Sequence, residues 1–422
     1  MENVHIKKYA AYKPSGVDWL GEIPEHWKIK RFKFIADTQK GKLPQKIVSI
    51  NDSNLPPYMS MEYLRGGEEN QWVLDKNAKI IQKDEVLLLW DGSNAGEFIK
   101  SRKGVISSTV AQINFKNIEK CFAWYYSKFI EAELKQKTIG MGIPHVSGNI
   151  LNNILTLIPP LPEQNSIADF LDRKTAQIDQ AIGIKEKQIE LLKERRQILI
   201  HRAVTRGLNS NVKLKDSGVE WIGEIPEHWE AVCNRILFQE RNEPGNESLA
   251  ILSVSIHTAV SSEELSEEDN LHGKNRIADK SSYKLVRPND VVFNMMRAWQ
   301  GAIGAVRVNG MVSPAYVVAE PIVSISSDFF EYQYRTAGFI QQMDRFSKGI
   351  TDFRKRLYWN EFKQLKTILP PFSEQKEIIT YIEIISNKIA TAISLKEKEI
   401  EKLKEYKACL INEVVTGKIK VG

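Results

Sequence analysis

The sequence predicts an α+β protein made of two similar halves, and three observations lead to this prediction. The phrase SGVDWLGEIPEHW, from Ser15 to Trp27, returns almost unchanged as SGVEWIGEIPEHW, from Ser217 to Trp229. A second repeat begins with PPLPEQ and returns 211 residues later with PPFSEQ, and a long proline-free stretch follows each copy. Short β-rich runs lie between these repeats, so each half combines a globular part with one long helix.

The bulk composition fits an ordered protein of several parts. A chain of 422 residues exceeds one ordinary core, and 42% hydrophobic with 27% charged residues is typical of globular chains. The longest uninterrupted apolar runs, such as VLLLW at Val86 to Trp90, fall short of the roughly 20 residues of a membrane span. We therefore expect no membrane association and a cytoplasmic location.

Cysteine content and net charge exclude few classes of protein. The three cysteines show no CxxC spacing, which argues against a disulfide framework or a zinc knuckle. A net charge of +6 is compatible with nucleic acid binding but does not establish it.

The repeated phrase offers no chemistry of its own. One histidine and two glutamates beside a proline turn form neither a metal-ligand set nor a catalytic pair. We predict that Trp27 and Trp229, with Pro24 and Pro226, anchor the start of each globular part.

The globular parts cover residues from about 28 to 158 and from about 230 to 369. Strand-like runs such as DEVLLLW and DVVFNMM are followed by helical stretches, CFAWYYSKFIEAELKQK in the first part and DFFEYQYRTAGFIQQMDRF in the second. An offset of 206 residues equates Asp84 with Asp290, Gly104 with Gly310 and Ser107 with Ser313. The loops differ within this common frame, which indicates a common task with different targets.

Basic, amide and aromatic residues gather in these loops and before each Pro-Pro pair. Arginine and amide side chains read guanine and adenine edges, and lysines contact phosphates. A solvated surface charge is the alternative for each residue taken alone, so the prediction depends on clusters such as DFRKRLYW. The candidate DNA-binding residues are Lys100, Arg102, Lys103, Lys137, His145, Arg297, Trp299, Gln300, Arg345, Lys348, Arg354, Lys355 and Arg356.

Each long helix begins after a Pro-Pro pair and carries apolar residues at heptad spacing. The seam consists of Leu171, Ile178, Ile182, Ile189, Leu192 and Leu199 in the first helix, and of Ile382, Ile389, Ile393, Ile400, Leu403 and Leu410 in the second. Lys185 and Lys396 interrupt one row of the seam, and Arg196 and Lys407 the other, as polar residues that fix register do. Two separate amphipathic helices, each lying on its own globular part, are the alternative to an antiparallel coiled coil.

No enzyme motif accompanies this architecture. The sequence lacks a GxxxxGK[ST] phosphate loop, HExxH, GxSxG and a dinucleotide fingerprint after a strand. The stretch NLPPY at Asn54 to Tyr58 departs from the NPPY motif of amino-methyltransferases by the additional Leu55. We therefore predict a non-catalytic chain without a bound metal or cofactor.

The GEIPEHW phrase that opens each half, and the PPLPEQ or PPFSEQ element that leads into each long helix, strongly resemble the specificity (S) subunit of type I restriction-modification systems. This resemblance covers essentially the whole chain. It implies target recognition domains at residues 1–158 and 209–369, and conserved spacer helices at residues 159–208 and 370–422 that form an antiparallel coiled coil. It also implies an asymmetric bipartite target with half-sites on the order of one helical turn apart.

The partners are likewise implied by the resemblance. They are double-stranded DNA, two methyltransferase (M) subunits with S-adenosylmethionine, and restriction and motor (R) subunits with ATP and magnesium. The M subunits flip the target adenine out of the stack. The alternative function is a free-standing DNA-binding coiled-coil scaffold or repressor, while a fused restriction-modification enzyme is disfavoured by the missing motifs.

Overall fold

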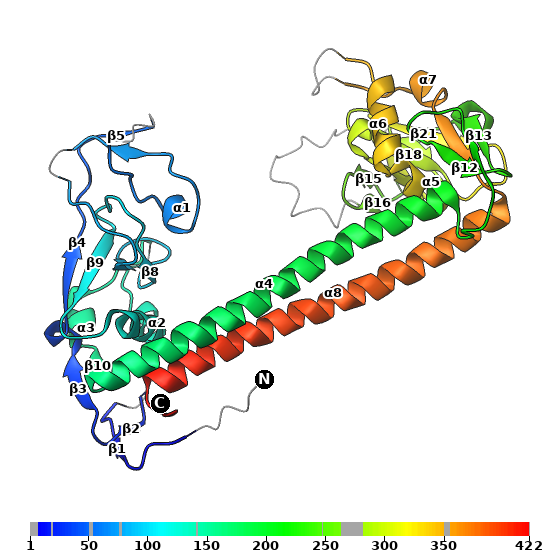
Figure 1. Cartoon of the computed structure of the whole chain (residues 1–422). Helices are drawn as coiled ribbons and strands as arrows, with labels where there is room; N and C mark the ends of the chain where they lie inside the picture. Colours follow the sequence, from blue (N-terminus) through cyan, green and yellow to red (C-terminus); the bar gives the residue numbers. More distant parts are fainter. Residues whose placement is uncertain are drawn as a thin grey trace. The chain divides into compact units, whose positions relative to one another are not determined.

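The chain divides into two compact units in the computed structural model (Figure 1). The structure describes residues 7–17, 20–49, 54–75, 78–140, 142–246, 248–262, 282–349 and 355–421. The first unit contains residues 1–185 and 397–422, and the second contains residues 186–396. Each unit therefore holds one globular part together with portions of both long helices.

The first unit contains a four-stranded antiparallel sheet in the order β4-β9-β7-β8 and several two-stranded pairs. Its elements are β1 (Tyr12–Pro14), β2 (Glu22–Pro24), β3 (Lys28–Arg31), the 3₁₀-helix η1 (Phe32–Phe34), β4 (Ala36–Lys40), β5 (Ile47–Val48), α1 (Met61–Leu64), β6 (Trp72–Val73), β7 (Val86–Leu89), β8 (Phe98–Lys100), β9 (Val110–Phe115), α2 (Lys120–Gln136), α3 (Gly148–Asn153), β10 (Leu155–Ile158) and the first part of α4 (Leu161–Arg206).

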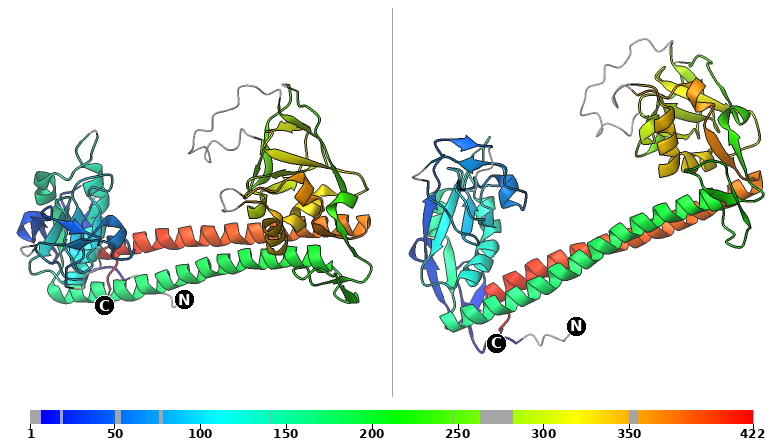
Figure 2. Two further views of the ribbon diagram at one scale, coloured as in Figure 1. Left: turned by 90° about the horizontal axis from the view of Figure 1, so that it is seen from above. Right: turned by 45° about the horizontal axis from the view of Figure 1, so that its top comes forward.

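The core of the first unit forms on both faces of this sheet. All four residues of β7 are buried, which explains the continuous apolar run VLLL in place of an alternating pattern. Helix α2 contributes buried aromatic side chains and contacts α4, where the Tyr125 hydroxyl donates to Asp172 Oδ1 at 2.6 Å. Both views in Figure 2 show the blue and teal globular part at the start of α4.

The second unit repeats this sheet in the order β14-β21-β18-β19. Its elements are β11 (Leu214–Asp216), β12 (Glu224–Pro226), β13 (Glu230–Cys233), the 3₁₀-helix η2 (Asn234–Ile236), β14 (Phe238–Glu240), β15 (Leu252–Ser255), β16 (Ala259–Ser262), β17 (Lys284–Val286), β18 (Val291–Asn294), the 3₁₀-helix η5 (Ala298–Gln300), β19 (Ile303–Ala305), β20 (Gly310–Val312), β21 (Tyr316–Pro321), α5 (Ser327–Tyr334), α6 (Ala337–Phe346), α7 (Trp359–Phe362), β22 (Lys366–Leu369), the last part of α4 and the first part of α8 (Phe372–Val415).

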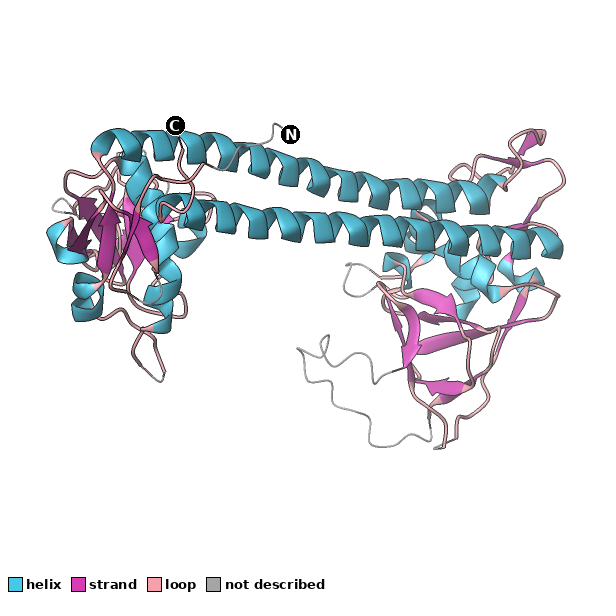
Figure 3. Cartoon of the chain, turned by 90° about the horizontal axis from the view of Figure 1, so that it is seen from below, coloured by secondary structure: helices cyan, strands magenta, loops and turns pink. Residues whose placement is uncertain are grey.

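An aromatic cluster fills the core of the second unit. Phe293 of β18 lies 4.6 Å, between ring centroids, from Phe362 of α7, and Tyr334 of α5 lies 5.4 Å from Phe339 of α6. Figure 3 shows strands flanked by helices in each globular part. The prediction of a mixed helix and strand fold is confirmed.

The predicted equivalence of Asp84 and Asp290 is wrong by one residue. Asp84 and Asn289 share a positive φ, 64° and 74°, at the turn before β7 and β18, and the glycines after these strands, Gly96 and Gly301, agree at 89° and 94°. The two strands are therefore 205 residues apart. Aspartate and asparagine tolerate the left-handed region, so backbone conformation and not side-chain identity aligns this turn. Asp290 is buried instead and accepts from Arg241.

The two long helices contact each other within each unit. In the first unit Lys407 Nζ lies 2.6 Å from Asp179 Oδ2, and Lys185 Nζ lies 2.7 Å from Glu399 Oε2, so the two segments run antiparallel. In the second unit Arg196 Nε donates to Ser386 Oγ at 3.1 Å. Leu171, Ile178, Ile182, Ile189, Ile382, Ile389, Ile400 and Leu410 of the seam are buried, and Leu192, Leu199, Ile393 and Leu403 are half-buried.

Helix α8 also modifies the expectation about membrane spans. It contains an 18-residue window with a mean hydropathy of 1.3, long and apolar enough to cross a membrane by length and composition. Uninterrupted apolar runs in the sequence are short, but the polar residues of α8 are scattered, so the mean hydropathy of the window stays high. One such helix is weak evidence for a span, because the core helix of a soluble protein satisfies the same criterion.

Candidate nucleic-acid interface

The two repeated motifs bind each other in both units. In the first unit Trp27 Nε1 donates to Glu163 Oε2 at 2.9 Å, and His26 Nε2 lies 2.6 Å from Glu163 Oε1. In the second unit Trp229 and His228 make the same contacts with Glu374, at 2.9 and 2.6 Å. Glu163 and Glu374 belong to the EQ pairs at the starts of α4 and α8. The repeated phrase therefore fixes each globular part to the start of a long helix, which supports the predicted anchoring role.

The glutamine of each EQ pair makes a second connection. Gln164 Nε2 donates to the Pro159 carbonyl at 2.8 Å, and its Oε1 accepts from the Glu119 amide at 2.8 Å, where α2 begins. Gln375 bonds to Pro370 and to the Ser326 amide before α5 in the same way, at 2.9 Å each. Sequence reasoning did not assign a role to these four EQ side chains, although their repetition beside Pro-Pro was the available signal.

Electrostatics distinguish the two anchors. Burial alone would raise the pKa of the Glu163 carboxyl, but hydrogen bonds from Trp27, His26 and Tyr9 outweigh it and lower the pKa. The Tyr9 hydroxyl donates to Glu163 Oε2 at 3.0 Å. The residue 202 positions later is Asn211, so the second unit has no tyrosine at this position.

A turn and a hairpin form one surface in the first unit. The turn after β7, residues 90–96, is joined to the described residues of the segment 139–146 by main-chain bonds, from Val146 N to the Trp90 carbonyl at 2.8 Å and from Gly92 N to the Pro144 carbonyl at 2.9 Å. The hairpin closes between His145 N and the Ile139 carbonyl at 2.8 Å. We call these residues the first turn–hairpin surface.

The second unit contains the same backbone arrangement. Arg356 N bonds to the Lys348 carbonyl at 2.8 Å, and Leu357 N bonds to the Met295 carbonyl at 2.9 Å. We call the described residues of 295–301 and 345–356 the second turn–hairpin surface. Because the connecting bonds are between main-chain atoms, side chains on this frame can change without loss of the frame.

The second surface brings together most of the candidates predicted in its half. Arg297, Gln300 and Arg345 are exposed, and Arg356 is half-buried. Lys355 Nζ lies 2.7 Å from Asp344 Oδ1 and 5.3 Å from the centroid of the Trp299 ring. Lys348 forms an ion pair with Glu361. Arg354 lies outside the described residues.

The first surface contains fewer of the predicted residues. His145 is exposed in the hairpin, and Lys137, just before it, forms an ion pair with Glu133. Lys40 at the end of β4 reaches this surface from a distant part of the sequence, 3.3 Å from Asp91 Oδ2 and 5.1 Å from the Trp90 ring centroid. Sequence reasoning missed Lys40, because only the paired strands bring it beside the turn.

Three candidates are not brought to the first turn–hairpin surface. Lys100 lies at the far end of β8 from the turn, 5.2 Å from the Trp124 ring centroid, and Lys103 is exposed just beyond it. Arg102 Nη1 donates to the Gly67 carbonyl at 2.6 Å, and its guanidinium lies 4.0 Å from the Tyr63 ring centroid. Arg102 thus has internal partners that hold α1 in place. Across the described ranges, no three His, Cys, Asp or Glu side chains are grouped so as to hold a metal ion.

Comparison with known sequences gives one family. Residues 24–194 match the family described as "Type I restriction modification DNA specificity domain". The chain is 30% identical over 426 residues to the type I restriction enzyme MjaVIII specificity subunit of Methanocaldococcus jannaschii, covering 94% of each chain. It is 25% identical to the EcoBI specificity subunit of Escherichia coli over 72% of this chain and 67% of that one.

Solved structures agree on the fold. A chain from a type I R-M system studied for its complex assembly and conformational transition has a TM-score of 0.64 at 13% identity, with 93% of this chain and 98% of that chain covered. The HsdS subunit of Thermoanaerobacter tengcongensis has a TM-score of 0.51 at 15% identity, with 94% and 98% covered. The predicted resemblance is confirmed, and the chain belongs to the family of type I restriction-modification specificity subunits, the DNA-recognition component of these systems.

Proposed function

We propose that this chain reads an asymmetric, bipartite target in double-stranded DNA. The target recognition domain at residues 1–158 reads one half-site, and the domain at residues 209–369 reads the other. The spacer helices, residues 159–208 and 370–422, form an antiparallel coiled coil that sets the distance between the half-sites. Support for the helix pairing comes from two ion pairs in the first unit, the hydrogen bond from Arg196 to Ser386 in the second, and buried seam positions in both.

The observation that carries this proposal is the duplicated turn–hairpin surface with different side chains. Asn94 and Ala95 occupy the turn positions that Trp299 and Gln300 occupy 205 residues later. One backbone frame thus presents different hydrogen-bonding groups, and base edges are distinguished by their patterns of donors and acceptors. Two such readers select two different half-sites, so a palindromic target is not expected.

The basic side chains of the second surface suit two kinds of contact. Arg297 and Gln300 are exposed and can approach base edges, where arginine pairs with guanine and glutamine with adenine. Lys348 and Lys355 are held by carboxylates and suit phosphate contacts that position the duplex.

The chemistry belongs, in this proposal, to partner subunits in the cytoplasm. Two M subunits dock on the conserved helices and carry S-adenosylmethionine, and R subunits bring ATP and magnesium. The chain itself contributes recognition without catalysis. Family membership and the absence of a phosphate loop, HExxH or GxSxG motif from the sequence support this division of roles.

The test maps methylated adenines by single-molecule sequencing in a methylation-free bacterial host that expresses the M subunit with or without this chain. We expect one gapped, asymmetric motif that appears only when this chain is present. Asn94→Ala and Gln300→Ala serve as each other's controls, because each should relax only one half of the motif.

Two results would contradict the proposal. If the subunits co-purify but no motif appears, the two surfaces do not supply recognition. If the subunits do not co-purify, a free-standing DNA-binding scaffold or repressor becomes the better explanation.

A further inference from the structure

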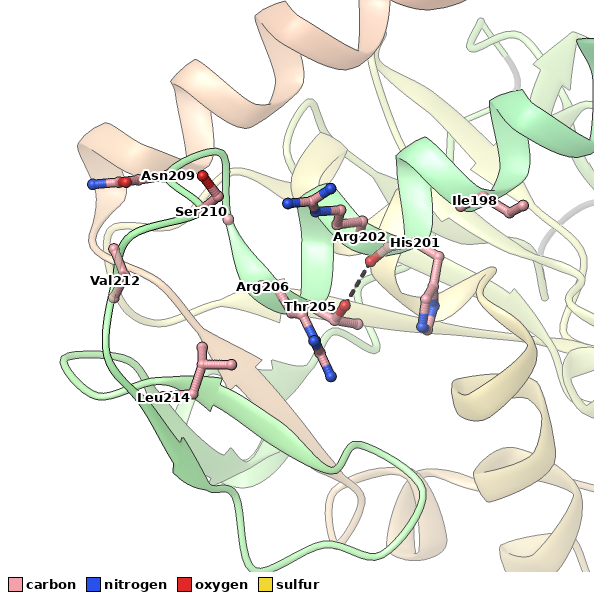
Figure 4. A pocket seen from close by; sticks show the side chains of 10 residues that line it. Ile198, His201, Arg202, Thr205, Arg206, Asn209, Ser210, Val212 and Leu214 are labelled. Atoms are coloured by element: carbon pink, nitrogen blue, oxygen red, sulfur yellow. Dashed lines mark hydrogen bonds between the residues drawn. The ribbon is translucent and has the colours of Figure 1, made fainter.

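A basic cleft lies in the second unit between the last turns of α4 and the segment that leads to β11 (Figure 4). Its volume is about 440 Å³, and its lining includes His201, Arg202, Thr205, Arg206 and Ser210. Figure 4 shows Arg202 and Arg206 extending from the helix beside the loop that carries Ser210. The cleft is formed by a different part of the unit from the second turn–hairpin surface.

The cleft has no internal counter-ion. Its lining residues include no aspartate or glutamate. Within the part of the chain that the structure describes, neither Arg202 nor Arg206 forms an ion pair, whereas Arg196 on the same helix bonds to Ser386. Partial burial and the positive charge of Arg206 lower the pKa of His201.

The equivalent end of α8 does not carry this charge. Helix α8 carries Asn412 and Glu413 where α4 carries His201 and Arg202. In both helices a threonine hydroxyl donates to the carbonyl four residues earlier, from Thr205 to His201 and from Thr416 to Asn412. Glycine follows Thr416 directly in α8, so Arg206 has no counterpart there.

Both helix ends nevertheless dock in the same way. A Cβ on Gly207 would lie 3.1 Å from the Trp229 ring, and a Cβ on Gly417 would lie 3.1 Å from the Trp27 ring. Since the docking is shared and the charge is not, the basic side chains of α4 need an explanation outside the fold.

We propose that this cleft binds a phosphate group. Planar guanidinium groups match phosphate geometry and form paired charge-assisted hydrogen bonds. Ser210, which is exposed on the loop beside the helix, adds a hydroxyl group to the lining. The phosphate comes either from the backbone of the DNA duplex or from a free phosphate compound, and only the DNA source depends on the proposed function.

The first experiment measures binding of inorganic phosphate by calorimetry, with the full chain assembled with its M subunits. We expect Arg202→Gln combined with Arg206→Gln to weaken phosphate binding at least tenfold. Lys193→Gln combined with Arg195→Gln is the matched control, because both residues are exposed on the same helix and the charge change is equal. The control should bind phosphate as the wild type does.

The second experiment identifies the source by measuring affinity for duplex DNA against salt concentration. If DNA supplies the phosphate, the slope of log affinity against log salt should fall by about 1 to 2 in the cleft variant and stay unchanged in the control. An unchanged slope together with lost phosphate binding assigns the cleft to a free phosphate compound. If wild-type and cleft variant bind phosphate equally and their DNA slopes agree, the proposal is wrong.

The phosphate proposal is also wrong if the only defect of the cleft variant is failure to assemble with the M subunit. The cleft would then contact an acidic protein surface. The methylation map of the wild type separates this proposal from the proposed function. A missing motif would refute DNA reading, while the phosphate titration would still decide whether the cleft is a phosphate site.

Discussion

One carboxylate holds the junction between each globular part and its helix. Glu163 accepts from Trp27, whose side chain is 0% exposed, and from Tyr9, and it pairs with His26. A buried indole N–H without an acceptor is costly, so the glutamate is not replaceable by an apolar residue of similar size. Glu374 performs the same task with Trp229 and His228.

Glutamine at either position should weaken the junction. In Glu163→Gln an amide group replaces one accepting oxygen and faces a donor, and hydrogen bonds to charged groups contribute roughly 1.5–3 kcal/mol. We expect a loss of about 2 kcal/mol in the free energy of unfolding. Glu374→Gln should lower the free energy of unfolding by less, because Glu374 has no tyrosine donor equivalent to Tyr9. Denaturant unfolding of the full chain, followed by tryptophan fluorescence, measures both losses.

Tyr9→Phe is the control for this comparison, since it removes only the third donor. Its loss should account for the difference between the two glutamine variants. Equal losses for Glu163→Gln and Glu374→Gln would show that the tyrosine contributes nothing to the anchor.

The lowered pKa of Glu163 makes the stability of the chain depend on pH in the acid range. The pKa of Glu163 is lower in the folded chain than in the unfolded chain, where it is about 4.3. Its contribution is therefore complete above that value and disappears as the pH falls through the lowered folded pKa. We expect the stability difference between wild type and Glu163→Gln to shrink below about pH 4. Unfolding curves at a series of pH values test this, and a difference that stays constant into acid would contradict it.

Secondary structure elements were predicted where the signal is local. The heptad spacing and the Pro-Pro starts of α4 and α8 identify two long helices, because helical periodicity is written in consecutive residues. The turn–hairpin contact could not be predicted, because main-chain bonds such as Val146 N to the Trp90 carbonyl leave no trace in side-chain pattern. Arg102 was placed among surface cations for the same reason, since its acceptors are backbone carbonyls.

The ends of the two long helices offer a matched test at this scale. Gly207 and Gly417 both have positive φ, 73° and 74°, so alanine should cost about 1 kcal/mol at either position. At Gly417 a Cβ would also lie 2.5 Å from Pro24, whereas at Gly207 its nearest neighbour is Trp229 at 3.1 Å. We expect Gly417→Ala to destabilise the chain by about 1 to 2 kcal/mol more than Gly207→Ala, since overpacking adds to backbone strain. Thermal unfolding of the two variants checks the order, and a larger loss at Gly207 would contradict it.

The whole molecule repeats one construction twice. In each unit the start of one long helix is held by a glutamate and a glutamine, and the end of the other long helix packs against the tryptophan held by that glutamate. The residues of the anchors and of the turn–hairpin surfaces lie outside the middle of the long helices. A change in helix length there should therefore leave both turn–hairpin surfaces unaltered. The proposed spacer role can accordingly be tested separately from base reading.

Removing one heptad from each helix, residues 186–192 and 392–398, is the direct test of that role. The deletion keeps the period of the seam and shortens each helix by about 10 Å at 1.5 Å per residue. At about 3.4 Å per base pair we expect the methylated motif to keep both half-sites while the gap between them loses about three base pairs. Single-molecule sequencing of the host genome reads the half-sites and the gap in one experiment, so unchanged half-sites serve as the internal control. An unchanged gap in an assembled complex would mean that the helices do not set the spacing.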